Sequence, residues 1–562
     1  MENRRFLLIA LFGAVLFFIY QAWQNDYPPA SAVSATPATA SVSTPSAKPV
    51  DEPASGTATV AATETAPGSG GATATADANA RIRVETDLYV AEIAPLGGEL
   101  RHLELKDYRV AKDKPEALAL LDDRNGRYFV LQSGLAGTAS ALITHETSFT
   151  SAQSSYVLEP GQDSLEVVLE HQGSDGLTAR KIYRFKRDSY EIGLEQTLRN
   201  DSAAALAVSP YVRLVRTDYK QGGEPKFSAT FTGVGFYQQS GDSYKFKKTK
   251  LKDLDGKAFE LQQKGGWISI LQHYFVTAIV PPADEAVSFA ARPSKTLGYN
   301  AQYVGSSVQL APGSEQSFPT QLYIGPKLQD RLEDVAPGFE LTLDYGILTA
   351  LAKPIFWLLK HFHNLLGNWG WSIIFLTIVV KSALFKLSEA QYRSMAKMKV
   401  FGPKIQEIRD RYADDRERQQ KAMMDLYKKE GFNPLAGCWP ILVQFPVFIA
   451  LYWVLLESVE MRQASFMWWI QDLSAPDPYY VLPVVYGLTM FLQQKMSGTQ
   501  TADPMQQRVM QMMPIFLTAF FTFFQSGLVL YWVVNGLISI SQQWYITRKL
   551  AHETTKKQLA AR

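Results

Sequence analysis

Apolar residues are grouped in three different ways along the chain, and the first grouping is a single long run near the start. Residues 6–23 are almost wholly apolar and follow two arginines. Roughly 20 such residues span a bilayer, so residues 1–24 are predicted to form an N-terminal transmembrane anchor. A cleaved signal peptide is the alternative, because Ala30-Ser31-Ala32 resembles a cleavage site. The length of the run, and Tyr20 and Trp23 at its interfacial end, favour the anchor.

Short runs in which apolar and polar residues alternate characterise the second region, residues 81–335. Period-two runs separated by turn signals predict an all-β sandwich. The clearest runs are Ser164–His171, Lys181–Arg187, Tyr190–Asn200, Trp267–Val280 and Gln316–Pro326. Residues 25–80, which precede them, are mostly Ala, Thr, Ser, Pro and Gly. They hold too few large apolar side chains to offset chain entropy, so a disordered linker is predicted there.

Long apolar runs return after Pro337 and predict a helical membrane core. Residues 336–368 are predicted to contain an amphipathic helix along the membrane surface, interrupted at Pro354. Residues 369–547 contain five apolar spans, which with the anchor make six. These spans are Trp369–Leu387, Pro434–Leu456, Tyr479–Leu492, Val509–Phe524 and Leu528–Tyr545, the last two joined by a tight hairpin at Gln525-Ser526-Gly527.

A densely charged segment, residues 388–431, separates the first two of these spans. Its apolar residues recur at helical spacing, and Asp414 followed by Glu417 resembles a capping box. We therefore expect two antiparallel helices outside the membrane. A plain solvated connector is the alternative.

The distribution of Lys and Arg predicts which side of the membrane each part occupies. Residues 388–431 and the short tail, residues 548–562, are rich in these bases, whereas Glu457–Asp477 contains only Arg462. By the positive-inside rule, both termini and the helical hairpin are cytoplasmic, and the β domain is exported. This arrangement indicates a multi-pass protein of a bacterial inner membrane whose large domain lies in the periplasm.

Composition excludes several classes of function. A net charge of +2 predicts no large nucleic-acid surface, and the single Cys438 allows no intramolecular disulfide. The β region contains no Walker loop, no H-E-x-x-H, no G-x-S-x-G and no Cys/His cluster, so a spacer or docking domain is the better interpretation. His361 and His363 are two histidines without further ligands, which more often are interfacial polar groups than a metal site.

Lys381 is a charged residue within the apolar span Trp369–Leu387. Its flexible stem could let the ammonium reach the headgroups, and that interpretation is as good as any from this span alone. The other four spans hold no Asp or Glu, so an ammonium kept inside must face water or a transient partner. Uncharged polar residues could line a hydrated cavity with it; these are Thr377, Gln444, Thr518, Asn535, Ser539 and Gln542.

Several motifs in this region resemble the YidC/Oxa family of membrane protein insertases, in its Gram-negative form. They include NWGWSIIFLTIVVK, AQYRSMAKM, NPLAGCWPILVQFPVFIALYWVL, DPYYVLPVVYGLTMFLQQKM, DPMQQRVMQMMP and SGLVLYWVVN. The resemblance implies an N-terminal anchor, a periplasmic β-sandwich and a five-span core with a cytoplasmic hairpin. It also implies a hydrophilic groove that carries one cation and receives the polar part of an incoming protein.

Carried over by motif, the resemblance assigns roles to particular residues. Lys381 takes the place of the groove cation. Many relatives have arginine there, and lysine keeps the charge but lacks the guanidinium group that binds a carboxylate through two parallel hydrogen bonds. Polar or aromatic groove neighbours would be Thr377, Gln444, Tyr531, Trp532 and Asn535, and relatives often have tyrosine where Trp532 stands. The apolar slide for the entering segment would be Phe445, Phe448, Leu517 and Phe520, although ordinary packing between spans would explain each of these equally well.

The expected function is therefore that of an insertase and chaperone for inner membrane proteins, acting alone or with the Sec translocon, and not of an enzyme. The expected partners are nascent inner membrane proteins, the Sec translocon, the lipid bilayer and the ribosome, the last through the hairpin and the loop of residues 497–508; no cofactor is expected. A solute transporter or channel is the alternative function, but it would need acidic coupling groups and internal repeats. A scaffold that displays the β domain would leave Lys381 unexplained.

Overall fold

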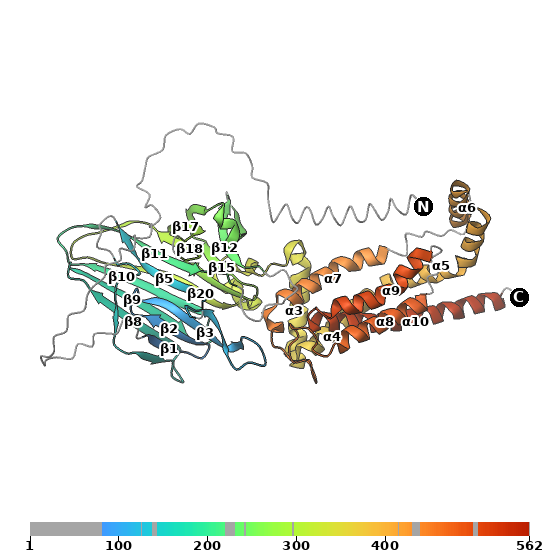
Figure 1. The fold of residues 1–562 in the computed structure, drawn as a ribbon, viewed down its shortest axis with the longest axis horizontal. Helices are drawn as coiled ribbons and strands as arrows, with labels where there is room; N and C mark the ends of the chain where they lie inside the picture. Colours follow the sequence, from blue (N-terminus) through green and yellow to red (C-terminus); the bar gives the residue numbers. More distant parts are fainter. Residues whose placement is uncertain are drawn as a thin grey trace, which may run out of the picture. The chain divides into compact units, whose positions relative to one another are not determined.

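The structure is a computed structural model that describes residues 81–124, 126–137, 143–219, 231–240, 243–294, 297–413, 415–429, 439–497 and 504–560. These residues form two compact units, one before and one after the boundary at Leu343 and Asp344 (Figure 1). The predicted anchor and linker, Cys438 and Asp414 lie outside the described residues.

The first unit contains two large sheets. Neighbouring strands are antiparallel, apart from β1 with β7, throughout the described part of the unit. The eleven-stranded sheet has the order β14 (Phe259–Lys264), β17 (Ala286–Pro293), β18 (Tyr299–Gly305), β11 (Leu206–Arg216), β5 (Phe129–Gly137), β3 (Glu99–Arg109), β2 (Tyr89–Ala94), β1 (Ile82–Glu85), β7 (Ser155–Val157), with β19 (Val308–Leu310) beside β11 and β4 (Ala117–Leu121) beside β3.

The nine-stranded sheet is the second layer of this unit. Its order is β13 (Ser243–Lys250), β12 (Gly233–Ser240), β15 (Trp267–Leu271), β16 (Phe275–Val280), β20 (Glu315–Pro326), β10 (Glu191–Asn200), β9 (Leu177–Lys186), β8 (Ser164–Gln172), β6 (Thr150–Ser151). Alternate side chains of β9 and β10 are buried, as the period of a strand with one face on a core requires. The predicted all-β sandwich is confirmed.

Buried tyrosines connect the two sheets. Tyr183 of β9 donates its hydroxyl hydrogen to the carbonyl of Gly98 at 2.7 Å, and Tyr89 of β2 donates to the carbonyl of Ile324 in β20 at 2.8 Å. Because both hydroxyls are deeply buried, these bonds satisfy groups that water cannot reach. They fix how the two inner faces pack.

The second unit is helical. After α2 (Gln329–Val335), which belongs to the first unit, the helices are α3 (Thr349–Leu366), α4 (Trp369–Ala383), α5 (Phe385–Arg411), α6 (Arg416–Lys429), α7 (Trp439–Glu457), α8 (Val481–Ser497), α9 (Pro504–Phe521) and α10 (Ser526–Ala560). Short 3-10 turns lie at Leu251–Asp255, Phe339–Thr342, Gly346–Leu348 and Val459–Met461. In its described length, α10 packs against α4, α5, α7 and α8, and is thus the central helix of the unit.

Four local expectations are corrected. The run Trp267–Val280 is two strands, because Gln272–Tyr274 form a turn, and α3 continues through Pro354 without interruption. The span Trp369–Leu387 is not one helix, because α4 ends at Ala383 and α5 begins at Phe385 after a bend of 66°. The cap of α6 is Asp415, whose Oδ1 accepts the backbone N–H of Arg418 at 3.0 Å; because residue 418 is not Glu or Gln, this is a simple cap and not the predicted capping box that begins at Asp414.

Among the described helices, none is by itself both long enough and apolar enough to cross a membrane. The pair formed by α4 and Phe385–Ala396 of α5 has the length and composition for a crossing only when the two are taken together, across the 66° bend. The helix α10 includes most of the predicted tail, since it runs to Ala560.

Candidate functional site

Lys381 lies in the last turn of α4, directly before the bend. The final carbonyls of a helix lack partners within it and carry partial negative charge, so this position favours a cation. The backbone carbonyl of Lys381 accepts a hydrogen bond from Nε2 of Gln542 in α10, at 3.3 Å. Gln542 of the central helix α10 thereby satisfies one of the free backbone carbonyls at the C-terminal end of α4.

The ammonium of Lys381 is enclosed but not paired. The residue is 4% exposed, and no acceptor for its Nζ is present among the described residues. An unpaired charge inside an apolar body costs several kcal/mol, so such a cation is stable only with water or an anion beside it.

Three polar residues of α10 form a stripe on one side of the helix: Asn535, Ser539 and Gln542, at positions i, i+4 and i+7. We call them the polar stripe. Such spacing places them on one face over about 10.5 Å, at about 1.5 Å per residue. The stripe contacts α7 through the hydrogen bond from Gln444 Nε2 to Asn535 Oδ1 at 3.5 Å, and α4 through Gln542. Gln444 of α7 and the backbone carbonyl of Lys381 in α4 thus both contact the polar stripe of α10.

The predicted hydroxyl groups bond within their own helices. Thr377 donates to the carbonyl of Ile373 and Thr518 to that of Pro514, each at 2.7 Å, and Ser539 donates to the carbonyl of Asn535 at 2.7 Å. Their hydrogens are therefore used locally, and each oxygen remains only as an acceptor.

Five rings from four helices form an aromatic cluster: Phe448 of α7, Tyr486 of α8, Phe521 of α9, and Tyr531 and Trp532 of α10. Phe448 lies 4.4 Å from Trp532 and 6.1 Å from Tyr531, between ring centroids. Tyr486 and Phe521 lie 5.7 Å and 5.8 Å from Trp532. The indole N–H of Trp532 is buried, with no acceptor among the described residues. It is a donor that the cluster leaves unused.

The predicted slide residues adjoin this cluster. Phe445 is 50% exposed and its ring lies 6.4 Å from Phe448; Phe520 is 45% exposed and its ring lies 5.8 Å from Phe521. Leu517 is half-buried on α9, one turn before Phe520. The rings of α7 and α9 are thus connected through the cluster by contacts that also hold Trp532.

Two residues of the site were not found from the sequence. Tyr486 contacts both Phe521 and Trp532, and Tyr392 of α5 donates its hydroxyl hydrogen to the carbonyl of Ser539 at 3.2 Å. The available signal was weak, because the motifs that contain them, AQYRSMAKM and DPYYVLPVVYGLTMFLQQKM, give neither tyrosine a role. Only the packing of α5 and α8 on α10 brings them to the site.

Large apolar side chains are exposed over much of the helical unit but over little of the β unit. Among the described residues of the β unit they are Leu96, Val157 and Leu297. In the helical unit they include Trp357, Leu365, Trp371, Phe375, Ile378, Leu442, Phe445, Val484, Leu488, Phe491, Met512, Ile515, Phe516, Phe520, Phe523, Leu537 and Trp544. Apolar surface of this extent marks contact with lipid or with another protein.

The two histidines of α3 both stack on tryptophan. The ring of His361 lies 5.7 Å from Trp357, and that of His363 lies 3.9 Å from Trp369. Within the described ranges, no three His, Cys, Asp or Glu side chains are grouped closely enough to hold a metal ion.

Comparison with known proteins gives consistent matches for both units. Residues 81–358 match the family model of the YidC periplasmic domain, and residues 361–554 match that of the 60Kd inner membrane protein. The membrane protein insertase YidC of Methylococcus capsulatus is 43% identical over 99% of this chain and 100% of its own length. That of Nitrosococcus oceani is 42% identical over 98% of this chain and 100% of its own length.

A crystal structure of an active YidC insertase is also similar to 84% of this chain, over 93% of its own length. The similarity is low, with 15% identity and a TM-score of 0.36, and it adds nothing to the sequence matches.

Proposed function

Because the chain belongs to the YidC family of membrane protein insertases, we propose that it inserts proteins into the inner membrane through a groove built from Lys381 and the polar stripe of α10. The observation that carries this proposal is the enclosed and unpaired ammonium of Lys381, a residue whose backbone carbonyl contacts Gln542 of that stripe. An acidic or polar segment of an incoming protein would supply the partner that Lys381 lacks. The attraction is stronger there than in water because the surroundings are largely apolar.

The apolar segment of the same substrate would follow a different surface. Phe445 and Phe520 are exposed rings beside the aromatic cluster, and the exposed apolar side chains of α7 and α9 continue from them. We propose that this surface leads the segment into lipid, while the polar part is held near Lys381. Binding and release suffice for this process, and no covalent bond is broken.

The proposal includes six spans, cytoplasmic termini and a periplasmic β unit. The apolar predicted spans, the basic hairpin and the exposed apolar surface of the helical unit support it. Nascent inner membrane proteins would be the substrates, with the Sec translocon and the ribosome as partners. The basic residues of α5 and α6 are the favoured contact with the ribosome.

Insertion by purified protein in liposomes tests the role of Lys381. The substrate is a short single-span protein with an acidic exported tail, and the variants are Lys381→Ala and Lys381→Arg. We expect Lys381→Ala to reduce the insertion rate roughly tenfold or more, as loss of one charge-assisted contact would, and Lys381→Arg to retain most of it. The matched control is Lys386→Ala, because Lys386 lies five residues away with a side chain 91% exposed.

A second substrate, whose acidic tail residues are changed to their amides, separates attraction from stability. It should lose most of its dependence on Lys381. If Lys381→Ala inserts both substrates as well as the unchanged protein does, Lys381 is a snorkelling residue, and the groove proposal for it is wrong. A uniform loss with both substrates would show damage to the fold and also contradict charge recognition.

A further inference from the structure

A pocket of about 330 Å³ lies in the β unit, on the face of the eleven-stranded sheet that is turned away from the nine-stranded sheet. The side chain of Ser133 faces the nine-stranded sheet, because its Oγ accepts a hydrogen bond from Nζ of Lys181 in β9, at 2.9 Å. Neighbouring residues of a strand point to opposite faces, so Gln132 points into the pocket. Arg213 of β11 lies directly opposite Gln132 in the register and shares this face.

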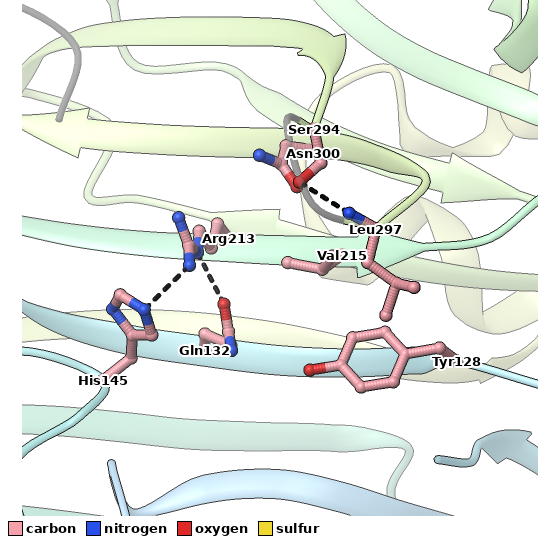
Figure 2. A pocket seen from close by; sticks show the side chains of 8 residues that line it. All are labelled: Tyr128, Gln132, His145, Arg213, Val215, Ser294, Leu297 and Asn300. Carbon is pink, nitrogen blue, oxygen red and sulfur yellow. Dashed lines mark hydrogen bonds between the residues drawn. The ribbon is translucent and has the colours of Figure 1, made fainter. Parts of the chain in front are cut away.

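Arg213 is a buried cation whose partners in the pocket are neutral. It is 6% exposed; its Nε donates to Gln132 Oε1 at 2.6 Å and its Nη2 donates to His145 Nε2 at 3.0 Å (Figure 2). Among the described residues no carboxylate pairs with it, and three of its five N–H groups have no acceptor. A guanidinium stays charged at all relevant pH values, so an anion is the complement that the pocket lacks.

Its two partners hold the guanidinium in a fixed orientation. An N–H of Arg213 can only donate, so Nε2 of His145 is an acceptor and the ring is neutral, with its hydrogen on Nδ1. That Nδ1 lies 3.0 Å from the hydroxyl of Tyr211. Gln132 in turn donates to Glu99, and Glu99 pairs with Arg101 at 2.7 Å. The carboxylate bonded to Gln132 is therefore compensated by another arginine and does not neutralise Arg213.

A second unsatisfied group points to the chemistry of the ligand. Oδ1 of Asn300 in β18 is buried without a hydrogen-bond donor, and Asn300 is 6% exposed. Asn300 pairs in register with Val215, and Val215 lies two residues after Arg213. Asn300 is therefore a diagonal cross-strand neighbour of Arg213, at about 7–8 Å. Val215, Leu297 and the ring of Tyr128 add apolar surface to the lining, and Ser294 completes it.

We propose that this pocket binds a small organic carboxylate that carries a hydroxyl or N–H donor within a few bonds of its carboxyl group. The carboxylate accepts from Arg213, and the donor satisfies Asn300. The volume would hold about eleven water molecules at about 30 Å³ each, so the bound group has about ten non-hydrogen atoms. Such a group is either a free hydroxy acid or the C-terminal residue of an exported polypeptide. This inference does not depend on the insertion mechanism.

Binding to the full-length protein in detergent, measured by titration calorimetry, tests the proposal. The probes are gluconate, with glucose as its uncharged counterpart, and a short peptide with a free C-terminus, with the same peptide amidated. We expect one of the two carboxylates to bind and its uncharged counterpart to bind roughly tenfold more weakly or worse. Gluconate alone would identify the ligand as a hydroxy acid, and the peptide acid alone would identify it as a chain terminus.

Two variants locate the binding. Arg213→Gln should weaken the binding of the carboxylate roughly tenfold or more, whereas Arg180→Gln, at an exposed arginine of the same unit, should not change it. If Arg213→Gln does not fold, Asn300→Asp provides the same test, because a second carboxylate in the pocket repels the ligand. The proposal is overturned if neither carboxylate binds, if the uncharged probes bind equally well, or if the variants leave binding unchanged.

Discussion

Several side chains in this protein combine charge with burial, and three of these cations differ in the partners they have. Lys381 and Arg213 are enclosed without a carboxylate partner among the described residues, whereas Lys181, when protonated, has an acceptor for each of its three N–H groups. Its Nζ donates to the carbonyl of Gly97 at 2.6 Å, to the carbonyl of Ser133 at 2.7 Å and to Ser133 Oγ. The first two are therefore suited to bind a ligand, and the third to hold the two sheets together.

Lys181 gives the β unit a predictable dependence on pH. Burial lowers the pKa of its ammonium from 10.5 to about 7, and the nearby Glu99 opposes that shift only partly. Between about pH 7 and pH 10.5, Lys181 is therefore protonated in the unfolded chain but has lost its proton in the folded chain. Stability therefore rises with pH across this window, by up to about 1.36 kcal/mol per pH unit, and the gain is lost as the pH falls towards 7.

Hydrogen exchange of the β9 amides, converted to free energies of opening between pH 7.5 and 9, measures this effect. The difference between the native chain and Lys181→Met should change by about 1.36 kcal/mol per pH unit across that range. The absolute stability of the variant does not matter, because the slope alone reports the proton. If the free energies of opening of the native chain and of Lys181→Met change equally with pH, Lys181 keeps its ordinary pKa in the folded chain.

The same residues show what sequence reasoning finds and what it misses at this scale. Lys381 was found because a lysine inside an apolar run is unexpected. Arg213 was missed because charged residues are expected on the open face of a strand, and only the tertiary structure buries that face of β11. Tyr486 was missed because its contact with Trp532 joins two helices that are far apart in the sequence.

Helices and strands follow the sequence pattern wherever the pattern alone determines them. The alternation in Ser164–His171 and Tyr190–Asn200 predicts β8 and β10, because one face of each is buried on the core. The turn at Gln272–Tyr274 contains no Gly or Pro, so nothing local distinguishes it from strand. The uninterrupted α3 shows that Pro354, near the start of a helix, costs too little to break it once the helix packs on α4 and α7.

The cap of α6 provides a test at the scale of one element. This helix is exposed and polar, so its stability depends on local contacts more than on packing. Asp415→Ala removes the acceptor for the N–H of Arg418, which costs about 1 kcal/mol. We expect exchange of the first-turn amides to become roughly fivefold faster.

Asp425→Ala is the matched control for this prediction, because Asp425 is an exposed residue in the body of the same helix. It removes the same charge without removing a cap. Equal acceleration in both variants would show that charge, and not the cap, stabilises α6.

At the scale of the whole molecule, the two units differ in the surface they present. The helical unit exposes many large apolar side chains and the β unit few, which fits a chain with one unit in lipid and one in water. The basic residues of α5 and α6 are then expected on the cytoplasmic side, and the β unit on the other side.

Labelling with a membrane-impermeant thiol reagent tests this sidedness. In a Cys438→Ser background, Asp253→Cys introduces a thiol at an exposed site of the β unit, and Asp425→Cys introduces one at an exposed site of α6. Both are surface aspartates, so their intrinsic reactivities should be similar. In cells whose outer membrane alone is permeabilised, we expect Asp253→Cys to react and Asp425→Cys to remain unlabelled until the inner membrane is broken. Reaction of both in intact spheroplasts would place α6 and the β unit on the same side, and would rule out a cytoplasmic hairpin beside the groove.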